Sequence, residues 1–161
     1  MNRDPGRNPQ SARNYYDDIF LSKFNSSRAF QWVYTAGGSS NDSGTCISVE
    51  SDGTIYLAGY FDSSVDFDPG GGQDVHISKG QTDFFVVRLD SDGEYQWSRS
   101  WGGPGTDIAT GVGVDSSGKI YLTGFFWSQM DFSPGPGTVN RTPAGERDIF
   151  LYQILPTGEW Y

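Results

Sequence analysis

The sequence predicts an all-β protein, and three observations support this fold class. A segment at 51–61 returns almost unchanged at 116–126, an offset of 65 residues (51 to 116). Each copy begins with a turn at Gly53 or Gly118 and continues with β-branched and aromatic residues, which is typical of a strand that follows a tight turn. The 22 Gly and 8 Pro recur at fixed places within the repeat, which indicates many turns between short strands. No stretch carries the apolar spacing of a helix.

The 65-residue repeat runs through most of the chain without an insertion. The block that begins at Asp18 aligns with blocks that begin at Asp83 and Asp148. We therefore interpret residues 1–161 as a single repeat region that holds about 2.5 copies. The copies are 1–17 (partial), 18–82, 83–147 and 148–161 (partial).

Each complete copy is predicted to hold four strands joined by hairpin-length turns. In the first copy the strands lie near 18–25, 30–36, 45–50 and 54–61. In the second copy they lie near 83–90, 95–101, 110–115 and 119–126, and 148–155 opens a third. The intervening segment 63–82 is expected to be an exposed loop, because its Pro and Gly residues disfavour a regular central strand.

The strands are apolar on both faces, which decides how the sheets must pack. Ile55 and Leu57 lie on one face of their strand and Tyr56 on the other. A sheet with one face in water would alternate polar and apolar residues, so these sheets are predicted to be covered on both sides. Four-stranded antiparallel sheets packed face to face around an axis meet this demand. We therefore predict β-propeller blades, and about 2.5 repeats give an incomplete ring within one chain, since propellers have about four blades or more.

Charge and composition exclude several classes of function. The net charge of −9 repels nucleic-acid backbones and anionic lipid surfaces. Cys46 is the single cysteine, so neither an intrachain disulfide nor a cysteine metal cluster can form. No run approaches the ~20 apolar residues of a membrane span, and no signal peptide is recognisable, so membrane insertion is not expected.

The sequence resembles a family of β-propeller repeats known as SBBP repeats, over residues 18–161. The resemblance is carried by 49–59, by 83–93, and by Gln96-Trp97 followed by Gly102-Gly103. It implies a secreted or cell-surface protein of bacteria or archaea and no particular activity. It also implies the order of strands from the propeller axis outward: 45–50, 54–61, 83–90 and 95–101. On that phase the chain holds the outer half of one blade, a whole blade (45–101) and most of another (110–161).

The tryptophans fall into two groups. Trp32 and Trp97 occupy matching positions and could form a sugar-stacking platform, but a position filled in both copies is typical of packing between blades. Trp127 has Asp62 as its counterpart, so it belongs to one copy. It follows a strand, where ligand-contacting loops tend to lie. Trp127 is therefore the candidate ligand-binding residue.

Three carboxylates are candidate calcium ligands. Asp66 and Asp68 lie on a loop rich in Gly and Pro, and Asp131 repeats the first of them. Oxygen ligands at this spacing suit a hard cation such as calcium. The alternative is a structural turn, because the Glu that completes the familiar calcium loop is absent. The other recurrent carboxylates, such as Asp42 and Asp107, are interpreted as turn residues that accept backbone N–H bonds.

No constellation of catalytic residues is recognisable. His76, the single histidine, has no Ser or Cys partner at a defined spacing, so it is assigned no role. Glu50 and Asp115, on the innermost strands, could face a central channel, yet their presence in both copies favours a structural part. No catalytic residue and no cofactor other than calcium is predicted.

We expect a non-catalytic β-propeller segment that serves as a structural or interaction module of an extracellular or cell-surface protein. Its partners would be further repeats of a longer chain, other copies of itself, or a surface glycan or protein. Copies that join head to tail would close a ring or grow a filament. The alternative is part of a propeller enzyme that acts on polysaccharide, with acidic residues at the ring axis; such a carboxylate pair must lie ~5–9 Å apart.

Overall fold

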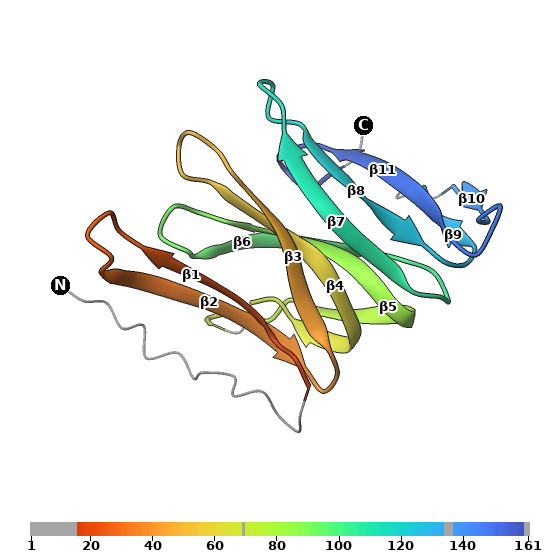
Figure 1. The fold of residues 1–161 in the computed structure, drawn as a ribbon, viewed down its shortest axis with the longest axis horizontal. Helices are drawn as coiled ribbons and strands as arrows, with labels where there is room; N and C mark the ends of the chain where they lie inside the picture. Colours follow the sequence, from red (N-terminus) through yellow and green to blue (C-terminus); the bar gives the residue numbers. More distant parts are fainter. Residues whose placement is uncertain (1–15, 69, 134–136, 160–161) are drawn as a thin grey trace.

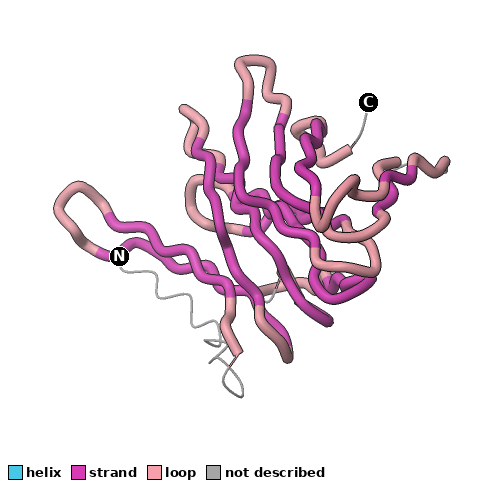
Figure 2. The backbone as a smooth tube through the Cα atoms, turned by 45° about the vertical axis from the view of Figure 1, so that its right-hand side comes forward, coloured by secondary structure: helices cyan, strands magenta, loops and turns pink. Residues whose placement is uncertain are grey.

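The computed structural model describes residues 16–68, 70–133 and 137–159, and within them the chain is built from strands and loops (Figures 1 and 2). The partial copy predicted at 1–17 lies mostly outside the described residues. In chain order the strands are β1 (Ile19–Phe24), β2 (Phe30–Gly38), β3 (Asp42–Val49), β4 (Ile55–Asp66), β5 (Val75–Leu89), β6 (Tyr95–Trp101), β7 (Asp107–Val114), β8 (Ile120–Phe126), β9 (Met130–Asp131), β10 (Asn140–Arg141) and β11 (Asp148–Ile154). In this described part, no helix is long and apolar enough to cross a membrane.

The central blade is a four-stranded antiparallel sheet in the order β3, β4, β5, β6. It is flanked by β1 and β2, which we call the N-terminal half-blade, and by β7, β8 and β11, which we call the C-terminal blade (Figure 1). The innermost strands β3 and β7 contact each other, and Thr45 Oγ1 donates to the carbonyl of Ala109 at 2.5 Å. The prediction of propeller blades is confirmed, and the described strands form no closed ring.

The repeat extends to the register of the strands. Ile55 pairs with Leu89 in the central blade, and Ile120 pairs with Ile154 in the C-terminal blade, each shifted by 65. The innermost strand of each blade bulges at the same place, after Gly44 and after Ala109. The bulge brings the carbonyl of Ser43 against Gly59, where a Cβ atom would collide with it. The backbone of β3 therefore approaches that of β4 closely at this glycine.

The same tight turn occurs five times in the described residues, four times between successive strands and once after β11. In each, the N–H of the first residue donates to the carbonyl of the residue four positions along, as Glu50 does to Thr54, and the N–H of the residue three positions along donates to the first carbonyl, as Gly53 does to Glu50. The third of the turn's inner positions has a positive φ and is glycine in four of the turns, as at Gly93 (φ 80°). Arg28 (φ 63°) occupies this position in the N-terminal half-blade. This backbone conformation costs a residue with a side chain about 1–2 kcal/mol, which explains the glycines.

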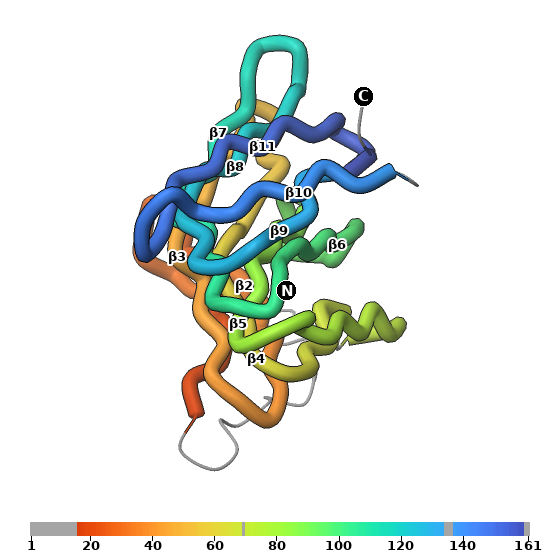
Figure 3. Tube along the Cα trace, turned by 90° about the vertical axis from the view of Figure 1, so that its right-hand side faces the viewer, coloured from red at the N-terminus to blue at the C-terminus, as the bar shows by residue number. Residues whose placement is uncertain are grey.

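The segment 63–82 is not the exposed loop that its composition predicts. Strand β4 runs on to Asp66 and β5 begins at Val75, and Val65 pairs with His76 in a ribbon (Figure 3). The end of β2 adds to this ribbon, since Gly38 pairs with Val65. Gly70, Gly71 and Gly72 lie in the turn between these strands, whereas Gly80 lies in β5 where its pairing with β4 is irregular. Val65 and Phe67 are fully buried and anchor the ribbon. In the C-terminal blade β9 and β10 form the shorter counterpart.

Two apolar cores lie on the two faces of the central blade. One core joins the half-blade to the central blade, through residues such as Tyr34, Leu57 and Phe85. The other joins the central blade to the C-terminal blade, through residues such as Phe84 and Phe150. The central blade is therefore covered on both sides, as the apolar character of both strand faces predicted.

Candidate functional site

Two blade faces are left uncovered by the other described blades, and they are the candidate functional surfaces. The N-terminal open face consists of side chains of β1 and β2 that point away from the central blade: Phe20, Phe24, Phe30 and Val33. The C-terminal open face consists of side chains of β8 and β11 that point away from it: Thr123, Phe125, Ile149 and Leu151. Alternation along each strand places these residues opposite the core residues of the same strand.

The repeat shows that these faces are built for burial. Phe20 is 70% exposed, whereas its counterparts Phe85 and Phe150 are 0% and 4% exposed. Ile149 is 75% exposed, whereas its counterparts Ile19 and Phe84 are 1% and 0% exposed. Large exposed apolar patches on a soluble domain typically mark interaction sites. Each open face therefore presents, to solvent, side chains that the other blades bury between sheets.

Contacts across the inner interfaces show how one blade meets the next. The rings of Phe84 in β5 and Phe150 in β11 stack with centroids 4.4 Å apart. Polar contacts frame this interface, since Trp97 Nε1 donates to the carbonyl of Pro156 at 3.2 Å and Arg99 Nε donates to that of Gly158 at 3.1 Å. Strand β6 of the central blade thus binds the turn at 155–158 of the C-terminal blade.

Trp32 and Trp97 both lie against the turn of the following blade. A Cβ atom at Gly93 would lie 2.6 Å from the Trp32 indole, and one at Gly158 would lie 3.2 Å from the Trp97 indole. Lys23 joins the first contact by donating to the carbonyl of Ser91 at 2.8 Å. The structure places both tryptophans between blades, in agreement with the packing interpretation. The absence of a side chain at this turn glycine leaves the space that the tryptophan ring occupies, and we call this space the tryptophan socket.

Arg28 fills the equivalent socket in the N-terminal half-blade. It stands where Gly93 and Gly158 face a tryptophan, and it keeps the same left-handed backbone. A blade that brought a tryptophan to this position would meet the Arg28 side chain. The N-terminal open face therefore differs from the covered faces at the position where they accept the neighbouring blade.

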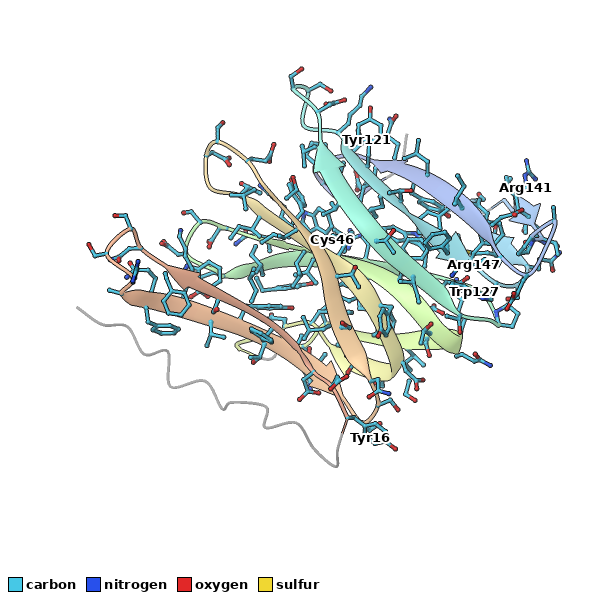
Figure 4. All side chains as sticks on the ribbon, in the orientation of Figure 1. Tyr16, Cys46, Tyr121, Trp127, Arg141 and Arg147 are labelled. Atoms are coloured by element: carbon cyan, nitrogen blue, oxygen red, sulfur yellow. The ribbon has the colours of Figure 1, made fainter. Side chains whose placement is uncertain are left out.

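Trp127 belongs to an aromatic and cationic cluster at one end of the C-terminal open face. The Arg147 guanidinium lies 4.5 Å from the ring centroid of Phe125 and 5.1 Å from that of Trp127, and the two rings are 6.2 Å apart (Figure 4). Trp127 is half-buried and Arg147 is exposed. Sequence reasoning found Trp127, because its counterpart is Asp62, but it missed Arg147. The counterparts of Arg147, Thr82 and Asp17, could have signalled it.

The candidate calcium ligands lie in two ribbon turns. Asp66 Oδ1 accepts the backbone N–H groups of Asp68 at 3.0 Å and Asp74 at 2.9 Å. Asp131 Oδ1 accepts those of Ser133 at 2.9 Å and of Val139. These bonds lower the pKa of Asp131. Among the described residues no three His, Cys, Asp or Glu side chains gather as a metal site, and calcium binding stays a prediction.

The recurrent carboxylates at the strand starts are buried and take part in turns. Asp42 Oδ2 accepts from Gly38 N at 2.8 Å, and Asp107 Oδ2 accepts from Gly103 N at 2.6 Å. Burial raises the pKa of Asp42 to about 7, against the opposing effect of its backbone hydrogen bonds. Burial likewise raises the pKa of Asp83 to about 6. These groups hold the chain where it passes between blades, as their recurrence predicted.

Sequence reasoning missed a polar network around His76. His76 Nδ1 lies 2.7 Å from Ser100 Oγ, and its Nε2 lies 2.9 Å from Ser98 Oγ and 3.4 Å from Asp74 Oδ2. Ser98 and Tyr95 both donate to Asp74. Burial raises the pKa of Asp74, but the hydrogen bonds from Ser98 and Tyr95 outweigh it and the pKa lies below its ordinary value.

This network joins the ribbon to β6, because His76 of β5 contacts Ser98 and Ser100 of β6. Asp74 and Ser98 contact the same ring nitrogen, and Ser98 is fully buried. The counterpart of Ser98 is Val33 and that of Tyr95 is Phe30. Polar residues at positions that are apolar in another copy were the signal that could have revealed the network.

The inner-strand carboxylate Asp115 is also engaged in a turn. Its Oδ1 accepts from Ser117 Oγ at 2.6 Å and from the backbone of Ser117 and Lys119, while Tyr121 donates to Oδ2 at 3.0 Å. The Ser117 hydroxyl is the largest cause that lowers the pKa of Asp115 to about 2. A group with this pKa serves as a hydrogen-bond acceptor and is poorly suited to general acid catalysis at neutral pH.

Comparison with known proteins agrees with the architecture. Residues 70–94 match a family described as "Domain of unknown function (DUF5122) beta-propeller". The chain is a β-propeller repeat segment. It is 31% identical over 141 residues to Regulatory protein FlaEY of Caulobacter vibrioides, which covers 88% of this chain and 14% of that protein. It is 27% identical over 132 residues to the Uncharacterized WD repeat-containing protein L264 of Acanthamoeba polyphaga mimivirus, covering 76% of this chain and 10% of that protein. The chain thus spans about a seventh or less of either relative.

Proposed function

We propose that this β-propeller repeat segment is a non-catalytic structural or interaction module of an extracellular or cell-surface protein, and that it assembles through its two open blade faces and its unpaired strand edges. The observation that carries the proposal is the exposure of Phe20 and Ile149, whose counterparts in the other blades are buried. Covering these side chains on assembly removes apolar surface from water, which favours association.

The pairing of the third strand of each blade supports the same proposal. In the central blade β5 pairs with β4 on one side and β6 on the other. Within the described residues, β1 pairs with β2 alone along its length and β11 pairs with β8 alone. An unpaired edge presents N–H and C=O groups that a further strand can bind.

The relatives indicate what could cover these surfaces. Both are far longer than this chain, so further blades can come from the same polypeptide or from other copies. The name of the Caulobacter relative, a regulatory protein, fits an interaction role. The resemblance to SBBP repeats is the basis for an extracellular or cell-surface location.

The test compares association of the chain with that of variants in which an open face is made polar. We expect the chain to associate with increasing concentration in sedimentation velocity, and Phe20→Ser and Leu151→Ser to weaken that association. Ile77→Ser is the matched control, because Ile77 lies on the ribbon and is 71% exposed, close to the 72% of Leu151. A monomer at every concentration, or an equal effect of Ile77→Ser, would contradict assembly through the open faces.

A further inference from the structure

Arg147 is held in place but has no carboxylate partner among the described residues. Its guanidinium lies against the rings of both Phe125 and Trp127, and no hydrogen bond or ion pair within the described chain uses its N–H groups. A guanidinium that stacks on aromatic faces keeps its in-plane N–H donors free, and these match the two oxygens of a carboxylate. The stacking restricts the side chain, so less rotamer freedom is lost when an anion binds.

The cluster occurs in one copy of the repeat, so the fold does not require it. The central blade has Tyr60, Asp62 and Thr82 at the positions of Phe125, Trp127 and Arg147. Phe125, Trp127 and Arg147 therefore differ from their counterparts and together form a cation that contacts two aromatic rings. They lie at the face of this blade that the described chain leaves open. Tryptophan and arginine are also the residues enriched at the energetic centres of protein interfaces.

The chain carries a matching group on its other open face. Asp17 and Asp18 lie directly before β1; Asp17 is exposed and Asp18 is half-buried, and desolvation together with the neighbouring Asp17 charge raises the pKa of Asp18. They precede Phe20, the most exposed residue of the N-terminal open face. An acidic pair beside an exposed aromatic ring is complementary to a cation beside an exposed Ile149.

The inner interface gives the alignment of these two faces. Phe84 of one blade stacks on Phe150 of the next. Ile149 is the counterpart of Phe84 one repeat later, and Phe20 occupies the same repeat position as Phe150. If a second chain continued the repeat, its Phe20 would therefore lie on Ile149 of the first chain. Because side chains two residues apart share a strand face, Arg147 is then brought beside Asp18.

We propose that Arg147, held against the rings of Phe125 and Trp127, is a carboxylate-binding residue, and that its ligand is the Asp17–Asp18 segment of a second copy of this chain, whose Phe20 packs on Ile149. This assignment rests on the proposed function and names its partner. Contact is centred on one strand of each face, β11 on β1, so the association is weak and falls with salt.

Charge reversal tests the pairing. We expect Arg147→Glu and Asp18→Lys each to weaken association about tenfold in sedimentation equilibrium, and the chain with both changes to recover to within about threefold of the unmodified chain. Arg141→Glu is the matched control, since Arg141 is exposed on the same blade and its guanidinium contacts only the carbonyl of Asn140 among the described residues. An equal loss for Arg141→Glu, or no recovery in the doubly changed chain, overturns the assignment.

Cross-linking separates failure of this assignment from failure of the proposed function. In a Cys46→Ala background, Phe20→Cys and Ile149→Cys together should give head-to-tail multimers with a short bismaleimide, since packed sheets lie about 10 Å apart. Neither single cysteine should give dimers. Dimers from Phe20→Cys alone would show a two-fold arrangement, which overturns the Arg147 pairing while leaving assembly through the faces intact. A chain that stays monomeric overturns both.

Discussion

The clearest test of the blade packing is to add one methyl group at Gly93. Gly93 has a φ of 80°, which costs a residue with a side chain about 1–2 kcal/mol. Its Cβ atom would also lie 2.6 Å from the Trp32 indole, so the ring would have to move, and overpacking of this kind costs about 1–3 kcal/mol. We therefore expect Gly93→Ala to lower the free energy of unfolding by about 2–5 kcal/mol.

Urea unfolding followed by circular dichroism measures this loss, and Gly118→Ala is the matched control. Gly118 has a φ of 81° in the same turn, but the nearest atom to its Cβ would be Pro156 Cγ at 3.1 Å. We expect it to lose mainly the backbone contribution, about 1–2 kcal/mol. Replacing Trp32 by Ala in the Gly93→Ala chain should then cost less than it does alone, because the collision is removed. Equal losses for the two glycine variants would refute the socket.

Three further outcomes follow from the structure. Trp97→Ala should cost about 2–4 kcal/mol of unfolding free energy, with Trp127→Ala below about 1 kcal/mol; a Trp97 loss under 1 kcal/mol contradicts interblade packing. Burial raises the pKa of Asp42 in the folded state to about 7, against an ordinary value of 3.8, so the folded state binds a proton at a higher pH than the unfolded state and gains stability as pH falls from 8 to 5. Asp42→Asn should flatten this rise in melting temperature. Parallel profiles for the variant and the unmodified chain would contradict the burial of this carboxylate. Excess calcium should raise the melting temperature of the unmodified chain above that of Asp68→Ala, whereas superimposable curves would exclude calcium at this loop.

The sequence was sufficient for the strands and their register because the repeat ties each residue to a counterpart. Once Ile55 and Ile120 are aligned, the pairing of one blade gives the pairing of the other. The ribbon after Asp66 was missed for a physical reason. Gly and Pro were taken to forbid strands throughout 63–82, whereas Gly70, Gly71 and Gly72 lie in the turn between β4 and β5, and the buried Val65 and Phe67 fix the ribbon.

The candidate sites were harder to predict because they form between segments that are distant in sequence. Trp127 was found since it departs from its counterpart, but Arg147, 20 positions later (127 to 147), reaches it only because β8 and β11 pair. The same holds for His76, whose contact with Ser98 depends on the ribbon. A rule that compares the copies position by position would have marked Arg147 and Ser98 without any structure.

The departures from the repeat are therefore more informative than the repeat itself. Positions that agree between copies, such as Trp32 and Trp97, are explained by burial between blades. Arg28 and Arg147 have no such explanation, and each is a cation at a position where the covered blades contact their neighbours. A cation at such a position discriminates by unfavourable fit as well as by attraction, because a blade with a tryptophan or a basic group opposite it is rejected. Two such residues on opposite faces give the segment a direction, and this direction is what an ordered array of nearly identical blades needs.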